Sequence, residues 1–101
     1  KIAAAPSGRA LFFSRAPIPS RSRVAYSNLL QQTGVIGFSK AFLNTFLKLS
    51  RTPLEIVEGI DMLRVLEHGY SVQVVMASRP TIGVDTPEEL ARARQAWYPE
   101  R

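Results

Sequence analysis

Two short apolar runs separated by turn-forming residues open the chain. The runs Lys1–Ala5 and Arg9–Ser14 flank a Pro-Ser-Gly turn, which predicts a β-hairpin. Pro17 and Pro19 end the second run, because proline donates no hydrogen bond to a sheet ladder. A polar stretch over 20–31 follows and predicts a loop.

Apolar residues then return in two arrangements. Thr33–Phe38 is apolar and contains two glycines, which permit close backbone approach, so we expect a third strand there. Ser39 can cap a helix over about Lys40–Leu49, in which Phe42 and Phe46 fall at helical spacing. We expect this apolar face to pack against a core.

A threonine capping box marks the next helix. Thr52 is followed by proline and, three residues on, by Glu55, while Gly69 is typical of the position just after a helix. One continuous helix is therefore predicted between Thr52 and Gly69. Its predicted apolar face includes Ile56, Ile60 and Leu63, and its polar stripe consists of Glu58, Asp61 and Arg64.

The end of the chain predicts one more strand and one more helix. Ser71–Met76 partly alternates between apolar and polar residues, as a strand does. Thr86, again followed by proline and by glutamate three residues on, predicts a helix over Pro87–Trp97. The residues expected to face inward are Leu90, Ala93 and Trp97. The order β-β-β-α-α-β-α predicts a layered α/β domain with a mixed sheet and about three helices.

Composition and charge narrow the classes of function. The 101 residues, 46% hydrophobic and 21% charged, predict a single domain over 1–101. There is no cysteine, which excludes disulfides and thiolate metal sites. Apolar runs are too short for a membrane span or a signal peptide, so we expect a cytoplasmic protein with no membrane partner.

The formal net charge of +5 could attract anions. The basic residues are scattered, however, and no DNA- or RNA-binding motif is present, so a nucleic-acid partner is not expected. The densest basic group is Arg15, Arg21 and Arg23. It is consistent either with a solvated loop or with a contact to an anionic substrate.

Asp85 is the carboxylate best placed for chemistry. It lies just outside the N-terminus of the last predicted helix, where a capped helix start can hold it at the end of a sheet. Mg²⁺ binds a few carboxylates together with phosphate and water, which suits Asp85. The alternative is that Asp85 only complements the helix dipole.

Three strings carry a resemblance to a known family. They are Ala10–Pro19, Pro53–Glu58 and Gly83–Glu89. In this order they resemble the C-terminal part of the sugar-acid cytidylyltransferases, above all the CMP-Kdo synthetases (3-deoxy-manno-octulosonate cytidylyltransferases), from Lys1 to about Trp97. The resemblance implies the C-terminal lobe of the nucleotide-diphospho-sugar transferase fold. It also implies a Mg²⁺-dependent reaction of CTP with a 3-deoxy-manno-octulosonate-like acid, which gives a CMP-sugar and pyrophosphate for lipopolysaccharide precursors.

The resemblance also assigns site residues. Asp85 matches the family's magnesium-binding aspartate, and Glu55 matches a glutamate that contacts the sugar acid, a role that competes with its helix cap. Arg15 lies near the family's active-site cleft, either as a clamp for a carboxylate or phosphate or as a surface arginine. Gln32 and the residue before it stand where family members carry an Arg-His pair. Gln32 would therefore hydrogen-bond the substrate but supply no positive charge. Glu58 also matches a family position, although we expect it to be a solvated helix acid.

The family's nucleotide-binding half has no counterpart among these residues. Its Arg/Lys- and Gly-rich phosphate loop and its Gln-Gly-Asp segment are missing, so we expect a fragment or truncated homologue that is inactive alone. The expected partners are the missing half or a second copy in a homodimer, with Arg9–Ser14 and Thr33–Phe38 near the interface. The alternative is a stand-alone dimeric interaction module that reuses this lobe without catalysis.

Overall fold

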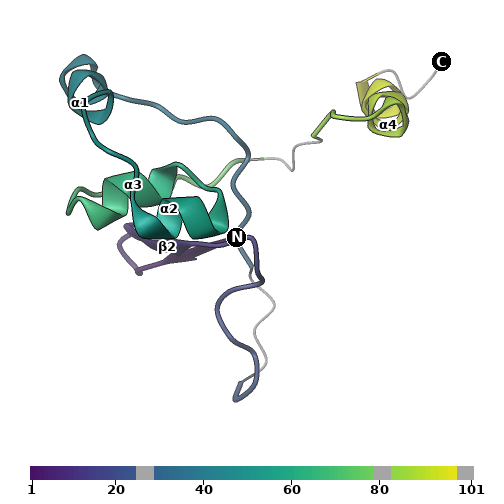
Figure 1. Cartoon of the computed structure of the whole chain (residues 1–101). Helices are drawn as coiled ribbons and strands as arrows, with labels where there is room; N and C mark the ends of the chain where they lie inside the picture. The colour runs from purple at the N-terminus through teal and green to yellow at the C-terminus, as the bar shows by residue number, and fades with distance from the viewer. Residues whose placement is uncertain (25–28, 79–82, 98–101) are drawn as a thin grey trace.

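An antiparallel hairpin forms one side of the core. The computed structural model describes residues 1–24, 29–78 and 83–97. Strand β1 (Ile2–Ala4) pairs with β2 (Ala10–Phe13), and the register places Ile2 opposite Phe13 (Figure 1). Gly8 closes the turn with a φ of 90° and donates its N–H to the Ala5 carbonyl at 2.8 Å. The predicted hairpin is thus confirmed.

The two further strands predicted from the sequence do not form. The segment 33–38 has no regular structure and is mostly exposed, and neither of the two described strands pairs with it. The segment 71–76 lies antiparallel to the hairpin but forms one bridge, between Gln73 and Arg9, rather than a strand. Two backbone hydrogen bonds flank this bridge: the Ala10 N–H donates to the Val72 carbonyl at 2.8 Å, and the Val74 N–H donates to the Gly8 carbonyl at 2.7 Å. Within the described residues the sheet has two strands, which are antiparallel. The prediction of a larger mixed sheet is therefore wrong for this part of the chain.

Four helices complete the described structure. They are α1 (Lys40–Phe46), α2 (Pro53–Glu58), α3 (Met62–Glu67) and α4 (Pro87–Trp97). Ser39 caps α1 as predicted, since its Oγ accepts the Phe42 N–H at 3.1 Å. The single helix predicted up to Gly69 is wrong. Gly59 takes a left-handed conformation, with φ 68° and ψ 34°, and divides it into α2 and α3.

The buried core lies between the hairpin and α3. Figure 1 shows α2 and α3 side by side over the hairpin. Among the described residues, the buried apolar ones are Ile2, Ala10 and Phe13 of the hairpin and Met62, Leu63 and Val65 of α3. Ile56 was expected on this face but is 59% exposed, because the break at Gly59 separates the inward faces of the two helices.

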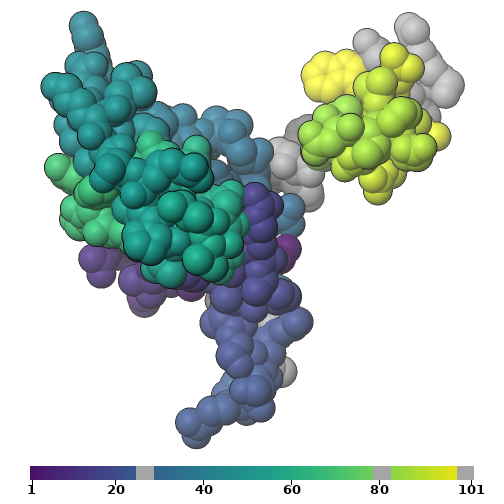
Figure 2. Space-filling view, in the orientation of Figure 1, coloured from purple at the N-terminus to yellow at the C-terminus, as the bar shows by residue number. Residues whose placement is uncertain are grey.

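The two outer helices differ in what they add to that core, since Phe42 and Phe46 of α1 pack against it as expected, although both are only partly buried. Neither α1 nor α4 contributes a buried residue, and Figure 2 shows α4 projecting away from the rest. The prediction that Leu90 and Trp97 face inward is therefore wrong, and Trp97 is 77% exposed. The radius of gyration is 16.2 Å, against about 13 Å for a compact domain of this length. None of the helices in the described ranges has the length and apolarity to span a bilayer.

Candidate functional site

A polar hollow of about 650 Å³ lies where the end of β2 meets α2 and the residues between α2 and α3. It brings together three residues that the sequence assigned to the site, namely Arg15, Gln32 and Glu55. The other polar residues around it are Lys1, Ser14, Gln31, Arg51 and Asp61. We call this set of residues the polar hollow.

Glu55 forms a buried part of the wall of the polar hollow, with only 4% of the residue exposed. Its Oε1 accepts the backbone N–H of Thr52 at 3.3 Å, which is one half of the predicted capping box. The Thr52 hydroxyl lies in the position of the other half but makes no hydrogen bond and is buried. The capping role of Glu55 therefore exists, and it occupies only one of the acceptor positions of the carboxylate.

Arg64 from α3 holds the same carboxylate in a two-point ion pair. Its Nε donates to Glu55 Oε1 at 2.9 Å, and its Nη2 donates to Oε2 at 2.5 Å. Its guanidinium also lies over the Phe46 ring, 4.9 Å from the ring centre. The hydrogen bonds from Arg64 lower the pKa of the Glu55 carboxyl against the opposing effect of burial. Glu55 is therefore ionised at neutral pH.

Sequence reasoning missed this role of Arg64. The periodicity of one continuous helix placed Arg64 on a polar stripe, nine residues after Glu55 and without a partner there. The chain turn at Gly59 brings α3 back beside α2, so that the two side chains meet. Reading Gly59 as a helix end would have been the signal, since glycine is the residue favoured after helices.

Arg15 binds the end of α2 as well as bordering the polar hollow. Its Nε donates to the Glu58 carbonyl at 2.7 Å, and its Nη2 donates to the Gly59 carbonyl at 2.8 Å. These carbonyls at the end of a helix lack intrahelical partners, so a cationic donor is favourable there. Arg15 is thus not a free surface arginine, because two of its N–H groups are bonded to α2. Only its remaining N–H groups could bind a ligand in the polar hollow.

Glu58 and Gln32 also differ from simple expectations. The Glu58 carboxylate accepts the Ser14 hydroxyl and the Arg15 backbone N–H, both at 3.0 Å. The prediction that Glu58 is a solvated helix acid is therefore wrong, because the residues that follow β2 pack against the end of α2 and bond to its carboxylate. Gln32 is half-buried, and its side-chain amide makes no hydrogen bond to the described residues. The neighbouring Gln31 accepts from Lys1 Nζ at 3.2 Å.

Asp85 lies two residues before α4 and is not among the residues that line the polar hollow. Figure 1 shows α4 well separated from β2 and α2. The Thr86 hydroxyl accepts the Glu89 N–H at 3.1 Å, and the Glu89 carboxylate accepts the Asp85 N–H at 3.1 Å. The predicted capping box therefore forms, with its acid bonded one residue earlier than expected. The Asp85 carboxylate itself is exposed.

The described residues do not by themselves fit a magnesium site. Among residues 1–24, 29–78 and 83–97, no three histidine, aspartate or glutamate side chains gather closely enough to hold a metal ion. Asp85 offers one carboxylate. Mg²⁺ usually takes one or two carboxylates and fills its other positions with phosphate and water. Any such ion would need ligands beyond those that the structure describes.

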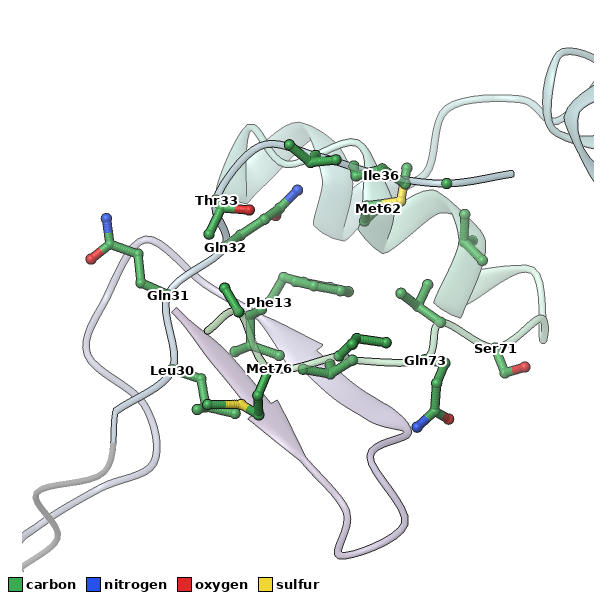
Figure 3. Close-up of a pocket in the computed structure, with 18 of the residues that line it drawn as sticks. Phe13, Leu30, Gln31, Gln32, Thr33, Ile36, Met62, Ser71, Gln73 and Met76 are labelled. Atoms are coloured by element: carbon green, nitrogen blue, oxygen red, sulfur yellow. The ribbon is translucent and has the colours of Figure 1, made fainter. Parts of the chain in front are cut away.

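A second, apolar hollow of about 840 Å³ is lined by Phe13 and shares Gln31 and Gln32 with the polar hollow. Figure 3 shows Phe13 in its middle, with Leu30 and Met76 together on one side and Met62 and Ile36 on the other. The exposed apolar residues beside it include Val35 and Val75. Its walls are the segments 29–38 and 71–78, the regions where predicted strands did not form.

Comparison with known proteins finds relatives along almost the whole chain. A 3-deoxy-manno-octulosonate cytidylyltransferase of Anaeromyxobacter sp. (strain K) is 44% identical over 95 residues, 93% of this chain and 39% of the relative. The enzyme of the same name from Syntrophotalea carbinolica is 41% identical over 101 residues, 91% of this chain and 40% of the relative. That from Nitratiruptor sp. is 37% identical over 99 residues, 97% of this chain and 41% of the relative.

No protein-family model matches the chain. The chain spans only about two fifths of the length of these curated relatives, in their C-terminal part. The resemblance inferred from the three sequence strings is nevertheless confirmed. Over 93% of its length, this chain is homologous to the C-terminal part of the 3-deoxy-manno-octulosonate cytidylyltransferases.

Proposed function

We propose that the chain is the sugar-acid-binding part of a cytidylyltransferase that couples CTP to 3-deoxy-manno-octulosonate or a similar acid. The observation that carries this proposal is the polar hollow, which gathers Arg15, Gln32 and Glu55 from three distant parts of the sequence. The names of the relatives support the substrate class. The product would be a CMP-sugar for lipopolysaccharide precursors, made in the cytoplasm.

The charges around the polar hollow favour an anionic ligand with hydroxyl groups. Arg15 and Arg51 border it, while the charge of Glu55 is balanced by Arg64. A carboxylate of the ligand would be attracted to the two arginines, and a hydroxyl would donate to Glu55. The amide of Gln32 can add a neutral hydrogen bond but no charge, so the arginines supply the electrostatic attraction.

Catalysis would need parts that this chain does not supply. In the proposed reaction a sugar hydroxyl attacks the α-phosphate of CTP and pyrophosphate leaves, which requires positioning and neutralisation of the phosphates. The sequence has no Gly-rich phosphate loop. We keep Asp85 as a proposed Mg²⁺ ligand, with a further carboxylate and the triphosphate coming from outside the chain. The chain alone is therefore proposed to be inactive.

Complementation tests this proposal directly. The chain would be incubated with labelled CTP, 3-deoxy-manno-octulosonate and Mg²⁺, alone and with the nucleotide-binding part of the Anaeromyxobacter relative. Labelled CMP-sugar is expected only in the mixture, and Glu55→Gln in this chain should reduce it. Product from the chain alone would overturn the proposed inactivity. A mixture whose product is unaffected by Glu55→Gln and by Arg15→Met would overturn the role of the polar hollow.

The apolar hollow favours a second candidate function, a dimeric interaction module without catalysis. Val35, Val75 and Met76 expose apolar surface around a cavity whose walls include segments without regular structure. Such surface favours association, and two-fold dimers are the commonest closed form. Light scattering at micromolar concentration distinguishes the states: a homodimer gives twice the 11.2 kDa of one chain, and a mass of one chain contradicts the module.

A further inference from the structure

The carboxylate of Glu55 has nearly all of its hydrogen-bonding capacity in use. An ionised carboxylate can accept about four hydrogen bonds. Arg64 donates two, at 2.9 and 2.5 Å, and the Thr52 backbone donates one, at 3.3 Å. Because Glu55 also lines the polar hollow, about one acceptor position remains for a ligand there.

Arg64 fixes the direction in which that last position points. The two bonds of the guanidinium determine the plane of the carboxylate, because a bidentate pair is geometrically specific. The guanidinium is itself held over the Phe46 ring, and its side chain is only 18% exposed. The pair thus joins α1, α2 and α3 at one point. A lysine could supply the charge but not the planar fork.

Arg64 also determines which kind of donor the remaining position favours. An unpaired carboxylate would attract ammonium groups and divalent cations. Paired with Arg64, it carries little net charge and still accepts a hydrogen bond, so a neutral hydroxyl is the better match. The charged groups facing Glu55 are Arg64 and, at 3.8 Å, Arg51. The other charges around the polar hollow are Lys1, Arg15 and Asp61.

We infer that Arg64 is a positioning residue, which holds Glu55 as a fixed acceptor for a hydroxyl group of the ligand in the polar hollow. This inference rests on the proposed function, because it needs a hydroxylated acid to bind there. A buried ion pair alone is weak evidence for a stability role, since apolar replacements are often as stable. Because Glu55 lines the polar hollow, the pair can serve ligand binding, a role that a purely structural ion pair would not have.

The test measures binding of the sugar acid proposed above to the intact chain between pH 4 and 8, for the parent, Arg64→Lys and Arg64→Met. We expect pH-independent affinity for the parent above about pH 5, since Glu55 stays ionised there. Arg64→Met should weaken binding at pH 7 at least about tenfold, the effect of misplacing one charged hydrogen bond. Its affinity should also fall further towards low pH, as Glu55 takes up a proton. Arg64→Lys should lie between the two.

Controls separate the possible failures. Arg94→Met, an exposed change on α4, should bind as the parent does. If Arg64→Met does not fold, the double variant Glu55→Gln with Arg64→Met removes the buried charge, and Arg64→Lys still reports the pH profile. Unchanged affinity and an unchanged pH profile in a folded Arg64 variant would overturn the inference alone. Absence of binding by the parent at every pH would overturn the proposed function and, with it, the inference.

Discussion

Ser14 donates its hydroxyl hydrogen to the carboxylate of Glu58 at 3.0 Å, although 44 residues separate the two. Ser14 follows the last residue of β2, and Glu58 is the last residue of α2. The same carboxylate accepts the backbone N–H of Arg15 at 3.0 Å. This contact therefore ties the hairpin to the helical layer at the edge of the polar hollow and helps to position Arg15.

Glu58→Ala should destabilise the chain. The change leaves the buried Ser14 hydroxyl and the Arg15 N–H without their partner, which typically costs about 1–3 kcal/mol. Urea unfolding followed by circular dichroism measures this. Glu88→Ala, an exposed acid on α4, is the matched control and should change stability by less than about 0.5 kcal/mol. Equal unfolding midpoints for Glu58→Ala and the control would contradict the role of the contact.

Gly59→Ala should lower stability by about 1–2 kcal/mol, the usual cost of a left-handed conformation with a side chain. Gly59 has a φ of 68°, and an added Cβ would lie 3.3 Å from Arg15 Nη2. Gly37→Ala is the control, because Gly37 has no such φ and an added Cβ there would meet none of the described residues within 4 Å. If the two variants unfold at the same urea concentration, the break between α2 and α3 has been misplaced.

Local signals in the sequence predicted the elements that depend on local chemistry. The hairpin around Gly8, the Ser39 cap and the limits of α4 were all predictable, because each depends on a few neighbouring residues. The extent of the strands at 33–38 and 71–76 was not, because strand length depends on pairing with a neighbouring strand. Among the described residues, 71–76 pairs with the hairpin only around Gln73, and 33–38 forms no bridge.

In the candidate site, too, the features that depend on neighbouring residues were predicted and those that depend on long-range contacts were not. Arg15 and Glu55 were identified from short strings, and the structure places both on the polar hollow. The partners that hold them were not predicted. Arg64 meets Glu55 only after the turn at Gly59, for which the glycine itself was the available signal, and Glu58 meets Ser14 only after the hairpin packs on α2. Long-range contacts of this kind depend on the assembled fold and leave no periodic trace in the sequence.

Glu55 should make the stability of the chain depend on pH in acid. Its carboxyl pKa is lowered by the hydrogen bonds from Arg64, so the folded state binds fewer protons than the unfolded state in this range. The resulting stabilisation is fully present above the unfolded value of about 4.3 and is lost as the pH falls through the lower folded pKa. The difference in unfolding free energy between the parent and Glu55→Gln should therefore shrink from pH 6 to pH 3. A constant difference would refute the ionised pair.

The chain alone should bind Mg²⁺ weakly, with a dissociation constant above about 1 mM, because Asp85 is a single exposed carboxylate. Titration calorimetry of the parent and Asp85→Asn should therefore give the same weak response. In the complemented mixture, Asp85→Asn should raise the Mg²⁺ concentration needed for product formation. Tight binding by the chain alone, abolished by Asp85→Asn, would show that a complete site exists without a partner.

The most direct test of the account is an NMR titration of the ¹⁵N-labelled chain with 3-deoxy-manno-octulosonate. If the polar hollow binds the sugar acid, the amide signals of Arg15, Gln32 and Glu55 should shift in a saturable way, while those of α4 stay in place. Chemical shifts that do not move up to about 10 mM ligand, well beyond the range of specific binding, would contradict the account. Shifts confined to residues that line the apolar hollow alone, such as Val35 and Val75, would contradict it equally.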